Sequence, residues 1–166
     1  MRLLIAYASK SGCCREMAEL LARELPQCTV TVADVERECP DPADFDYAVV
    51  GGPVRLGRGH RALARYLCAV EATLVNIPHT LFLCCANPAQ FENYAGRIFS
   101  QALLDSAEDV VYLGGELNPA RVRGFDRLIV RMVRNAIKDS EEDEAMLPGL
   151  LPEHVRLLAD RLRAKL

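Results

Sequence analysis

The chain has 166 residues, 51% of them hydrophobic and 26% charged, and its 20 Lys and Arg against 23 Asp and Glu give a formal net charge of −3. This length suits a single domain over residues 1–166 that buries roughly 70% of its unfolded surface. The charge balance excludes a typical nucleic-acid binder. No apolar run approaches the roughly 20 residues of a membrane span, so we expect a cytoplasmic protein. The seven cysteines are odd in number and include no Cys-x-x-Cys, which favours reduced thiols over a disulfide framework.

Short apolar runs alternate with longer segments of helical periodicity, which is the pattern of an α/β domain with a parallel sheet. In chain order this pattern predicts a strand over 3–8, a helix over 13–25, strands over 29–35 and 47–51, a helix over 60–71, a strand over 80–85, a helix over 91–104, a strand over 109–113, and helices over 122–138 and 153–165. The turn-rich stretch 38–44 demands no helix, and we expect the acidic, proline-containing segment 139–152 to be an exposed loop. The expected fold is a doubly wound, five-stranded parallel sheet with helices on both faces.

The loop after the first strand is the first candidate site, because ligands of such sheets bind beyond the carboxyl ends of the strands. It consists of Ser9, Lys10, Ser11, Gly12, Cys13 and Cys14. Hydroxyl groups, a glycine and backbone amides at a helix N-terminus suit a phosphate. The loop lacks the glycines of a Walker or dinucleotide fingerprint, which excludes the usual binding modes of ATP and NAD. The alternative is that Ser9 and Ser11 only cap the helix.

Several segments, in the expected order, resemble known proteins. They are residues 9–14 (SKSGCC), 46–53 (DYAVVGGP), 55–60 (RLGRGH), 93–99 (NYAGRIF) and 124–132 (GFDRLIVRM). The first two are similar to the phosphate loop and the third strand of flavodoxins. The others resemble the flavodoxin-like quinone-dependent protoporphyrinogen dehydrogenases. The resemblance extends to about residue 138 and implies the flavodoxin strand order 2-1-3-4-5.

This resemblance implies a noncovalent FMN, with its phosphate on residues 9–14. Its isoalloxazine ring would lie between two loops, formed by Pro53, Val54, Arg55, Leu56 and Gly57 and by Cys85, Ala86, Asn87 and Pro88. The implied activity passes electrons from a reduced substrate through FMN to a quinone, another acceptor or a redox partner protein. The flavin carries the chemistry, so no catalytic side chain is assigned, and no metal is expected.

Two positions depart from the family pattern. Cys14 stands where the family has Thr, and because a thiol is a poorer donor than a hydroxyl, we expect a loss of about 1 kcal/mol, or roughly fivefold to tenfold in FMN affinity. Leu56 stands where the related dehydrogenases have an aromatic residue, and the chain has no Trp. Stacking on the flavin ring must therefore come from Leu56, Tyr94 or Phe91, or be absent.

The predicted helix over 122–138 carries a basic stripe. Its cationic residues recur every three or four positions: Arg123, Arg127, Arg131, Arg134 and Lys138. Such a stripe suits an anionic membrane surface, with the protein peripheral at the inner membrane face, porphyrin propionates or an acidic redox partner. The alternative is an ordinary solvated face.

Four cysteines follow strands one and four. From the inter-strand spacing we expect the pairs Cys13-Cys14 and Cys84-Cys85 to lie about 10 Å apart, too far for all four to bind one zinc ion. Cys84 is expected in the core, with Cys85 the more exposed of its pair. At a helix N-terminus, Cys13 or Cys14 is expected to have a lowered pKa and to react with oxidants.

The histidines add less. His60 is expected to be structural at a helix start, with contact to substrate or flavin as the alternative, and His79 is expected at the surface. Two rival functions stay open. One is a flavodoxin-type electron carrier without a substrate of its own, and the other is a flavin-free thiol sensor or interaction module on the same fold.

Overall fold

The computed structural model describes residues 1–115 and 149–165. The predicted helix over 122–138 with its basic stripe, the motif at 124–132 and most of the predicted acidic loop lie outside the described residues. No helix within the described ranges is long and apolar enough to cross a bilayer.

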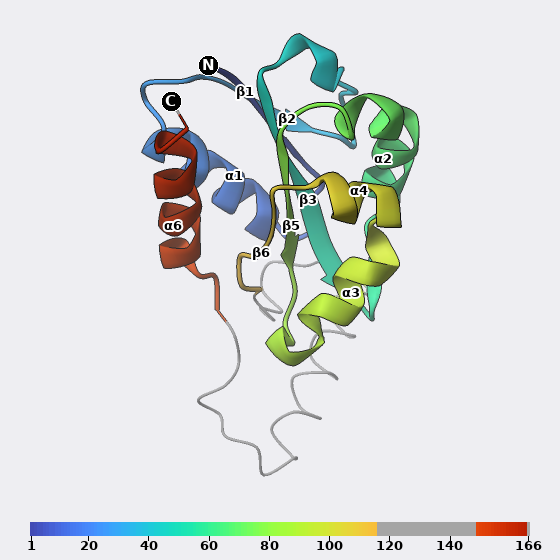
Figure 1. Cartoon of the computed structure of the whole chain (residues 1–166). Coiled ribbons are helices and arrows are strands. Elements are labelled where there is room, and N and C mark those ends of the chain that lie inside the picture. Colours follow the sequence, from blue (N-terminus) through green and yellow to red (C-terminus); the bar gives the residue numbers. More distant parts are fainter. Residues whose placement is uncertain (116–148, 166) are drawn as a thin grey trace.

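The elements follow the predicted alternation of strands and helices (Figure 1). The strands are β1 (Arg2–Tyr7), β2 (Thr29–Asp34), β3 (Tyr47–Arg55), β4 (Arg58–Gly59), β5 (His79–Cys84) and β6 (Asp109–Tyr112). The helices are α1 (Cys13–Glu24), α2 (Arg61–Leu74), α3 (Phe91–Ile98), α4 (Gln101–Ser106) and α6 (Pro152–Arg163), with short 3-10 turns η1 (Pro42–Asp44) and η2 (Pro88–Gln90).

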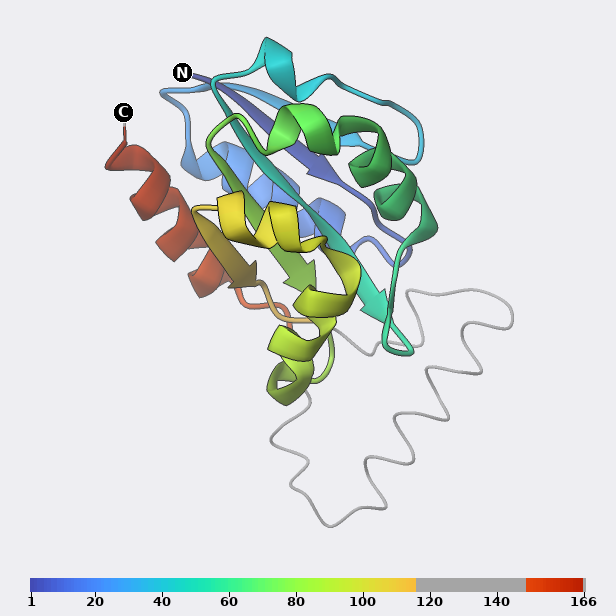
Figure 2. The same cartoon turned by 45° about the vertical axis from the view of Figure 1, so that its right-hand side comes forward.

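The sheet has the order β2-β1-β3-β5-β6, and the paired strands on this path are all parallel. Because β4 is a short hairpin partner of β3 outside this path, the order is the predicted 2-1-3-4-5 and confirms the flavodoxin-like doubly wound sheet. Helices α1 and α6 cover one face, and α2, α3 and α4 cover the other (Figures 1 and 2).

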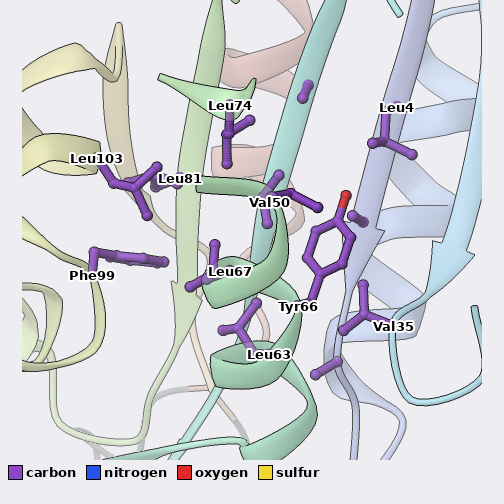
Figure 3. Packing of buried hydrophobic residues seen from close by; sticks show 14 of the residues in the cluster. Leu4, Val35, Val50, Leu63, Tyr66, Leu67, Leu74, Leu81, Phe99 and Leu103 are labelled. Carbon is purple, nitrogen blue, oxygen red and sulfur yellow. The ribbon is translucent and has the colours of Figure 1, made fainter. Parts of the chain in front are cut away.

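Each face of the sheet has its own hydrophobic core, which explains the continuous apolar run of β1. Leu3 and Ile5 point into the core under α1 and α6, whereas Leu4 and Ala6 point into the core under α2. All four are completely buried, as expected for a central parallel strand covered on both sides. Figure 3 shows side chains of α2, among them Leu63, Tyr66 and Leu67, packed beside the strands in the core that α2 covers.

The predicted helix over 91–104 is in fact two helices. Phe99 is extended, with φ −98° and ψ 143°, and it ends α3 with its side chain only 3% exposed. Ser100 then begins α4, because its Oγ accepts a hydrogen bond from the Leu103 N–H at 3.3 Å. Burial of the phenyl ring and the serine cap together favour a break in a segment that has helical periodicity throughout.

His79 is buried, so the prediction that it lies at the surface was wrong. It is the first residue of β5, is 0% exposed and pairs in register with Ala48 of β3. Its Nδ1 lies 2.9 Å from the Ile77 carbonyl oxygen, and its Nε2 has no hydrogen-bond partner among the described residues. The preceding proline indicated a strand boundary, but His79 lies within β5, between its partner Ala48 of β3 and Glu108, whose N–H donates to the His79 carbonyl at 2.9 Å.

Candidate functional site

Three loops meet at one edge of the sheet. They follow β1, β3 and β5, which are neighbours in the order β2-β1-β3-β5-β6. Because these strands are parallel, their carboxyl ends lie together, and this edge is where doubly wound sheets bind ligands. The predicted cofactor-binding residues lie in these loops or at the adjoining ends of α1 and β3.

The loop after β1 has the backbone of an anion site. Gly12 is the N-cap of α1 in the left-handed conformation, with φ 91°, and no side chain caps this helix end. The Ser9 Oγ accepts a hydrogen bond from the Gly12 N–H at 3.1 Å and so holds the turn closed. The Ser11 Oγ donates to the Cys13 Sγ at 3.3 Å. The positive end of the α1 dipole therefore opens at this loop without a competing cap.

The Cys14 thiol points away from the loop and into the core between α1 and the sheet. Cys14 is 0% exposed, and its thiol lies beside the Cys84 thiol in the same buried cluster. Burial, and then the contact with Cys84, raise the pKa of Cys14 well above its usual value. The prediction that this thiol has a lowered pKa was wrong, because desolvation outweighs the helix dipole.

Strand spacing predicts that the ends of β1 and β5 lie about 10 Å apart, yet one thiol of each pair, Cys14 and Cys84, lies in the same buried cluster. Strand spacing places only the strand ends, whereas Cys14 lies in the first turn of α1 and is buried in the core that also holds Cys84. All seven cysteines lie in the described residues, and none forms a disulfide. Within 1–115 and 149–165 no three His, Cys, Asp or Glu residues form a group that would hold a metal ion.

The loop after β3 is a tight hairpin. The strand continues past the predicted end to Arg55, and β4 returns antiparallel to it, with Val54 opposite Gly59. The two turn residues, Leu56 and Gly57, have φ values of 50° and 71°. Positive φ at both positions is the feature of type I′ turns, which match the twist of a hairpin. Glycine adopts this conformation without cost, but leucine is strained in it.

Leu56 is also 70% exposed, which makes it one of the two large hydrophobic side chains exposed on the described surface. The two aromatic candidates for contact with a flavin ring are placed differently. Phe91 packs against Tyr112 with ring centroids 5.7 Å apart, and the Tyr94 ring lies where a side chain at Gly57 would meet it at 3.7 Å. Leu56 is therefore the candidate that projects from the hairpin.

The loop after β5 begins with a buried cysteine, which corrects the expectation that Cys85 is the more exposed of its pair. Cys85 is 2% exposed and Cys84 is 3% exposed. The Cys85 N–H donates to the Gly114 carbonyl at 2.9 Å, and Gly115 packs so tightly on Cys85 that a Cβ there would lie 2.4 Å from its carbonyl carbon. Burial raises the pKa of Cys85 to about 11. The Cys85 Sγ donates a hydrogen bond to the Asn87 carbonyl at 3.5 Å.

Two residues that the sequence did not single out support this loop. The Tyr112 hydroxyl donates to the Cys85 carbonyl at 3.1 Å. The His154 ring meets the Tyr112 ring edge-on at 6.1 Å, and its Nδ1 lies 2.7 Å from the Tyr112 carbonyl oxygen. Tyr112 reads as an ordinary strand residue and His154 lies far away in the sequence, so no local signal indicates this arrangement. Beyond Cys85, Asn87 caps η2 through its Oδ1, which accepts from the Ala89 N–H at 3.1 Å.

His60 has the structural role that was expected of it. It is the N-cap of α2, and its Nδ1 accepts a hydrogen bond from the Ala62 N–H at 3.2 Å. His60 also lines a cleft of about 750 Å³ beside the hairpin. The remaining lining residues are Lys10, Glu36, Pro53, Arg55, Arg58, Gly59, Arg61, Ala62, Ala64 and Arg65. Predicted site residues from two of the three loops thus share one concave surface.

Comparison with known proteins gives relatives in sequence and in fold. The chain is 25% identical over 142 residues to protoporphyrinogen IX dehydrogenase [quinone] of Escherichia coli (strain K12), covering 80% of this chain and 78% of that protein. A Fusobacterium nucleatum flavodoxin bound to flavin mononucleotide has a TM-score of 0.59 at 11% identity, over 99% of this chain and 98% of that one. Oxidised Flavodoxin 2 from Bacillus cereus has a TM-score of 0.58 at 20% identity, over all of both chains. The family model of the flavodoxin domain matches residues 4–144, which are most of this chain. The chain therefore belongs to the flavodoxin domain family.

Proposed function

We propose that this protein is an FMN-dependent oxidoreductase of the flavodoxin-like protoporphyrinogen dehydrogenase type. Electrons would pass from a reduced substrate through FMN to a quinone or another acceptor. The observation that carries the proposal is Leu56, a large apolar side chain held exposed and in a strained conformation at the carboxyl edge of the sheet. Backbone strain of this kind persists only where the surrounding structure enforces it, and it is concentrated at active sites and ligand-binding sites. The similarity to the Escherichia coli dehydrogenase supports the type of reaction.

The residues of the loop after β1 fit a phosphate through the backbone rather than through many side chains. The uncapped N-terminus of α1 offers amide groups and a positive dipole end, and Gly12 has open space on the side where a Cβ would be. The Cys14 thiol faces the core, so Cys14 contributes only its amide. Compared with a loop that ends in threonine, the site loses one hydroxyl donor, which we expect to weaken FMN binding by about fivefold to tenfold.

The other two loops fit the two sides of a planar ring. When bound, FMN supplies reversible one- and two-electron transfer, which the side chains of this chain do not provide. Leu56 would cover one part of the ring and exclude water from it. On the other side, Cys85 and Tyr112 hold the loop of Ala86, Asn87 and Pro88 in place through the hydrogen bonds described above.

Binding of FMN is the first test. The purified protein is titrated with FMN, and binding is followed by quenching of flavin fluorescence and by the change in the visible spectrum. We expect saturation with one FMN per chain. A dissociation constant above about 50 μM, or a free-flavin spectrum at saturation, would overturn the proposal.

Substrate turnover separates this proposal from its rival, a flavodoxin-type electron carrier. The rival is favoured by the similarity in fold to flavodoxins along the full chain. We expect the FMN-loaded protein to oxidise protoporphyrinogen with a menaquinone analogue as acceptor. A carrier would bind FMN equally well and would exchange electrons with reductase proteins, but it would show no turnover with the two small molecules.

The thiol-sensor hypothesis has less support, because a reactive thiol needs exposure and thiolate character. Cys13 is 4% exposed and Cys14 is 0% exposed, with a raised pKa. Thiol counting before and after mild peroxide tests it, with Cys13→Ser and Cys14→Ser as comparisons. Peripheral membrane contact through the basic stripe at 123–138 stays a prediction, which a vesicle-binding assay with anionic lipids would test.

A further inference from the structure

The cleft beside the hairpin is strongly cationic. Lys10 enters it from the loop after β1, Arg55 and Arg58 from the hairpin, and Arg61 and Arg65 from α2. Glu36 is the one carboxylate among its lining residues. The chain as a whole has a net charge of −3, so this concentration of positive charge is a local feature.

The cationic side chains are placed at a cost to the fold. Arg55 and Arg58 stand directly opposite each other in the hairpin, where like charges destabilise the pairing. Arg61 and Arg65 are four residues apart on α2, so they share a face and repel each other. Arg58, Arg61 and Arg65 form no ion pair with any residue in the described part of the chain. A bound anion would offset this repulsion.

The N-terminus of α2 adds to the same field. Its first turn carries no acidic residue, so the positive end of the helix dipole is not neutralised there. The cap is the His60 side chain, which lies in the cleft wall. Helix dipole and side chains therefore attract the same sign of charge from three directions.

We propose that this cleft binds a small organic anion with two or more phosphate or carboxylate groups, at a site that shares Lys10 with the loop after β1 but is separate from the N-terminus of α1. A volume of about 750 Å³ is that of a small-molecule site. Four of the five cations are arginines, whose planar guanidinium groups bind phosphate and carboxylate oxygens in pairs. Pro53, Gly59 and Ala62 are short, so they leave room for the ligand between the long cationic side chains.

The position of the cleft relates this anion to the flavin. Lys10, Pro53 and Arg55 line the cleft and also belong to the loops assigned to FMN. An anion bound here would lie beside the hairpin that carries Leu56, where a donor or acceptor of flavin electrons has to approach. This last step rests on the proposed function, whereas binding of the anion itself does not.

The test is calorimetric titration of the FMN-loaded and the FMN-free protein with ADP and with citrate at low salt. We expect one of the two to bind with a dissociation constant below about 100 μM and to weaken as salt is added. Tighter binding of ADP would identify phosphate as the recognised group, and tighter binding of citrate would identify carboxylate. The double variant Arg61→Gln/Arg65→Gln should bind about tenfold more weakly or worse.

The matched control is the double variant Arg23→Gln/Arg156→Gln, which makes the same change in net charge at exposed positions of α1 and α6. Its affinity should stay within about twofold of the parent protein. Thermal melts establish that both variants are folded, and Arg58→Gln provides a second test on the hairpin should α2 not tolerate its change.

Three results would overturn the inference: neither anion binds below about 1 mM, the two double variants behave alike, or the anion and FMN displace each other one for one. The last result would make the cleft part of the flavin phosphate site. Anion binding in a protein that fails to bind FMN would instead refute the proposed function and leave this site standing.

Discussion

Replacing Leu56 with asparagine should change stability and FMN affinity in opposite directions. Leu56 occupies a left-handed position in the hairpin turn, with φ 50°, directly before Gly57 at φ 71°. Asparagine followed by glycine is the preferred pair for such a turn, because asparagine tolerates the left-handed region. Leu56→Asn should therefore relieve strain in the free protein and remove an apolar contact from the complex with FMN.

The two magnitudes follow from backbone strain and exposure. A left-handed conformation costs a non-glycine residue about 1 to 2 kcal/mol, so we expect the free energy of unfolding to rise by about 1 kcal/mol. The side chain is 70% exposed, so little packing is lost when it is removed. Covering that exposed part with a ring would contribute about 1 to 2 kcal/mol, and its loss should weaken FMN binding about fivefold to thirtyfold.

Urea unfolding of the FMN-free protein gives the first quantity, and fluorescence titration with FMN gives the second. Leu157→Asn is the control, because Leu157 is also an exposed large hydrophobic residue, at 55%, but lies on α6. It should leave the FMN affinity unchanged. The reasoning fails if Leu56→Asn lowers stability, or if it leaves the FMN affinity equal to that of the control.

Three further substitutions test the packing of the core and the pH dependence of stability. Gly51→Ala would place its Cβ 2.0 Å from the Phe82 carbonyl oxygen, so we expect a loss of at least about 3 kcal/mol in urea unfolding, and a folded variant of normal stability would contradict the packing. Tyr47→Phe removes the hydroxyl that contacts the buried Thr80 Oγ1 at 2.9 Å and should cost about 1 to 2 kcal/mol, measured in the same way. The pKa of the Cys85 thiol is about 11 in the folded protein, against an ordinary value of about 9 in the unfolded chain. Between these pH values the unfolded chain is deprotonated and the folded protein is not, so the free energy of unfolding should fall as pH rises from about 9 to 11. Cys85→Ala should make that fall shallower by up to about 2 kcal/mol in alkaline melts, and identical pH profiles would count against the burial of this thiol.

The alternation of strands and helices and the two cores follow from local patterns in the sequence, whereas the strand order was implied by the resemblance to flavodoxins. The run Leu3 to Ala8 is apolar at every position, which is characteristic of a strand covered on both faces, and the structure buries all six residues. The helix after it has apolar residues at helical spacing, and α1 begins at the predicted residue. Such patterns determine the elements because burial of one face or of two faces selects the side chains directly.

The errors concern residues whose environment is made by distant parts of the chain. His79 follows a proline and was expected at the surface, yet it begins a strand beside β3 and is completely buried. Phe99 continues a helical pattern, yet burial of its ring and the cap at Ser100 interrupt the helix. In each case the tertiary environment outweighs the preference of the local sequence for a surface position or for a helix. That environment cannot be inferred from the residues that flank His79 or Phe99.

For the candidate site, too, some features were predictable from the sequence and others depended on the tertiary structure. The sequence alone determined that this is a mildly acidic α/β domain, and the resemblance to flavodoxins implied the strand order that brings three loops of the recognised motifs together at one edge of the sheet. Only the tertiary structure decided the orientations. It turned Cys14 into the core against Cys84, left Leu56 exposed at a strained turn, and gathered four arginines and a lysine around one cleft. The physical reason is that periodicity specifies which face of an element is buried, whereas the direction of a loop side chain depends on what the rest of the fold packs against it.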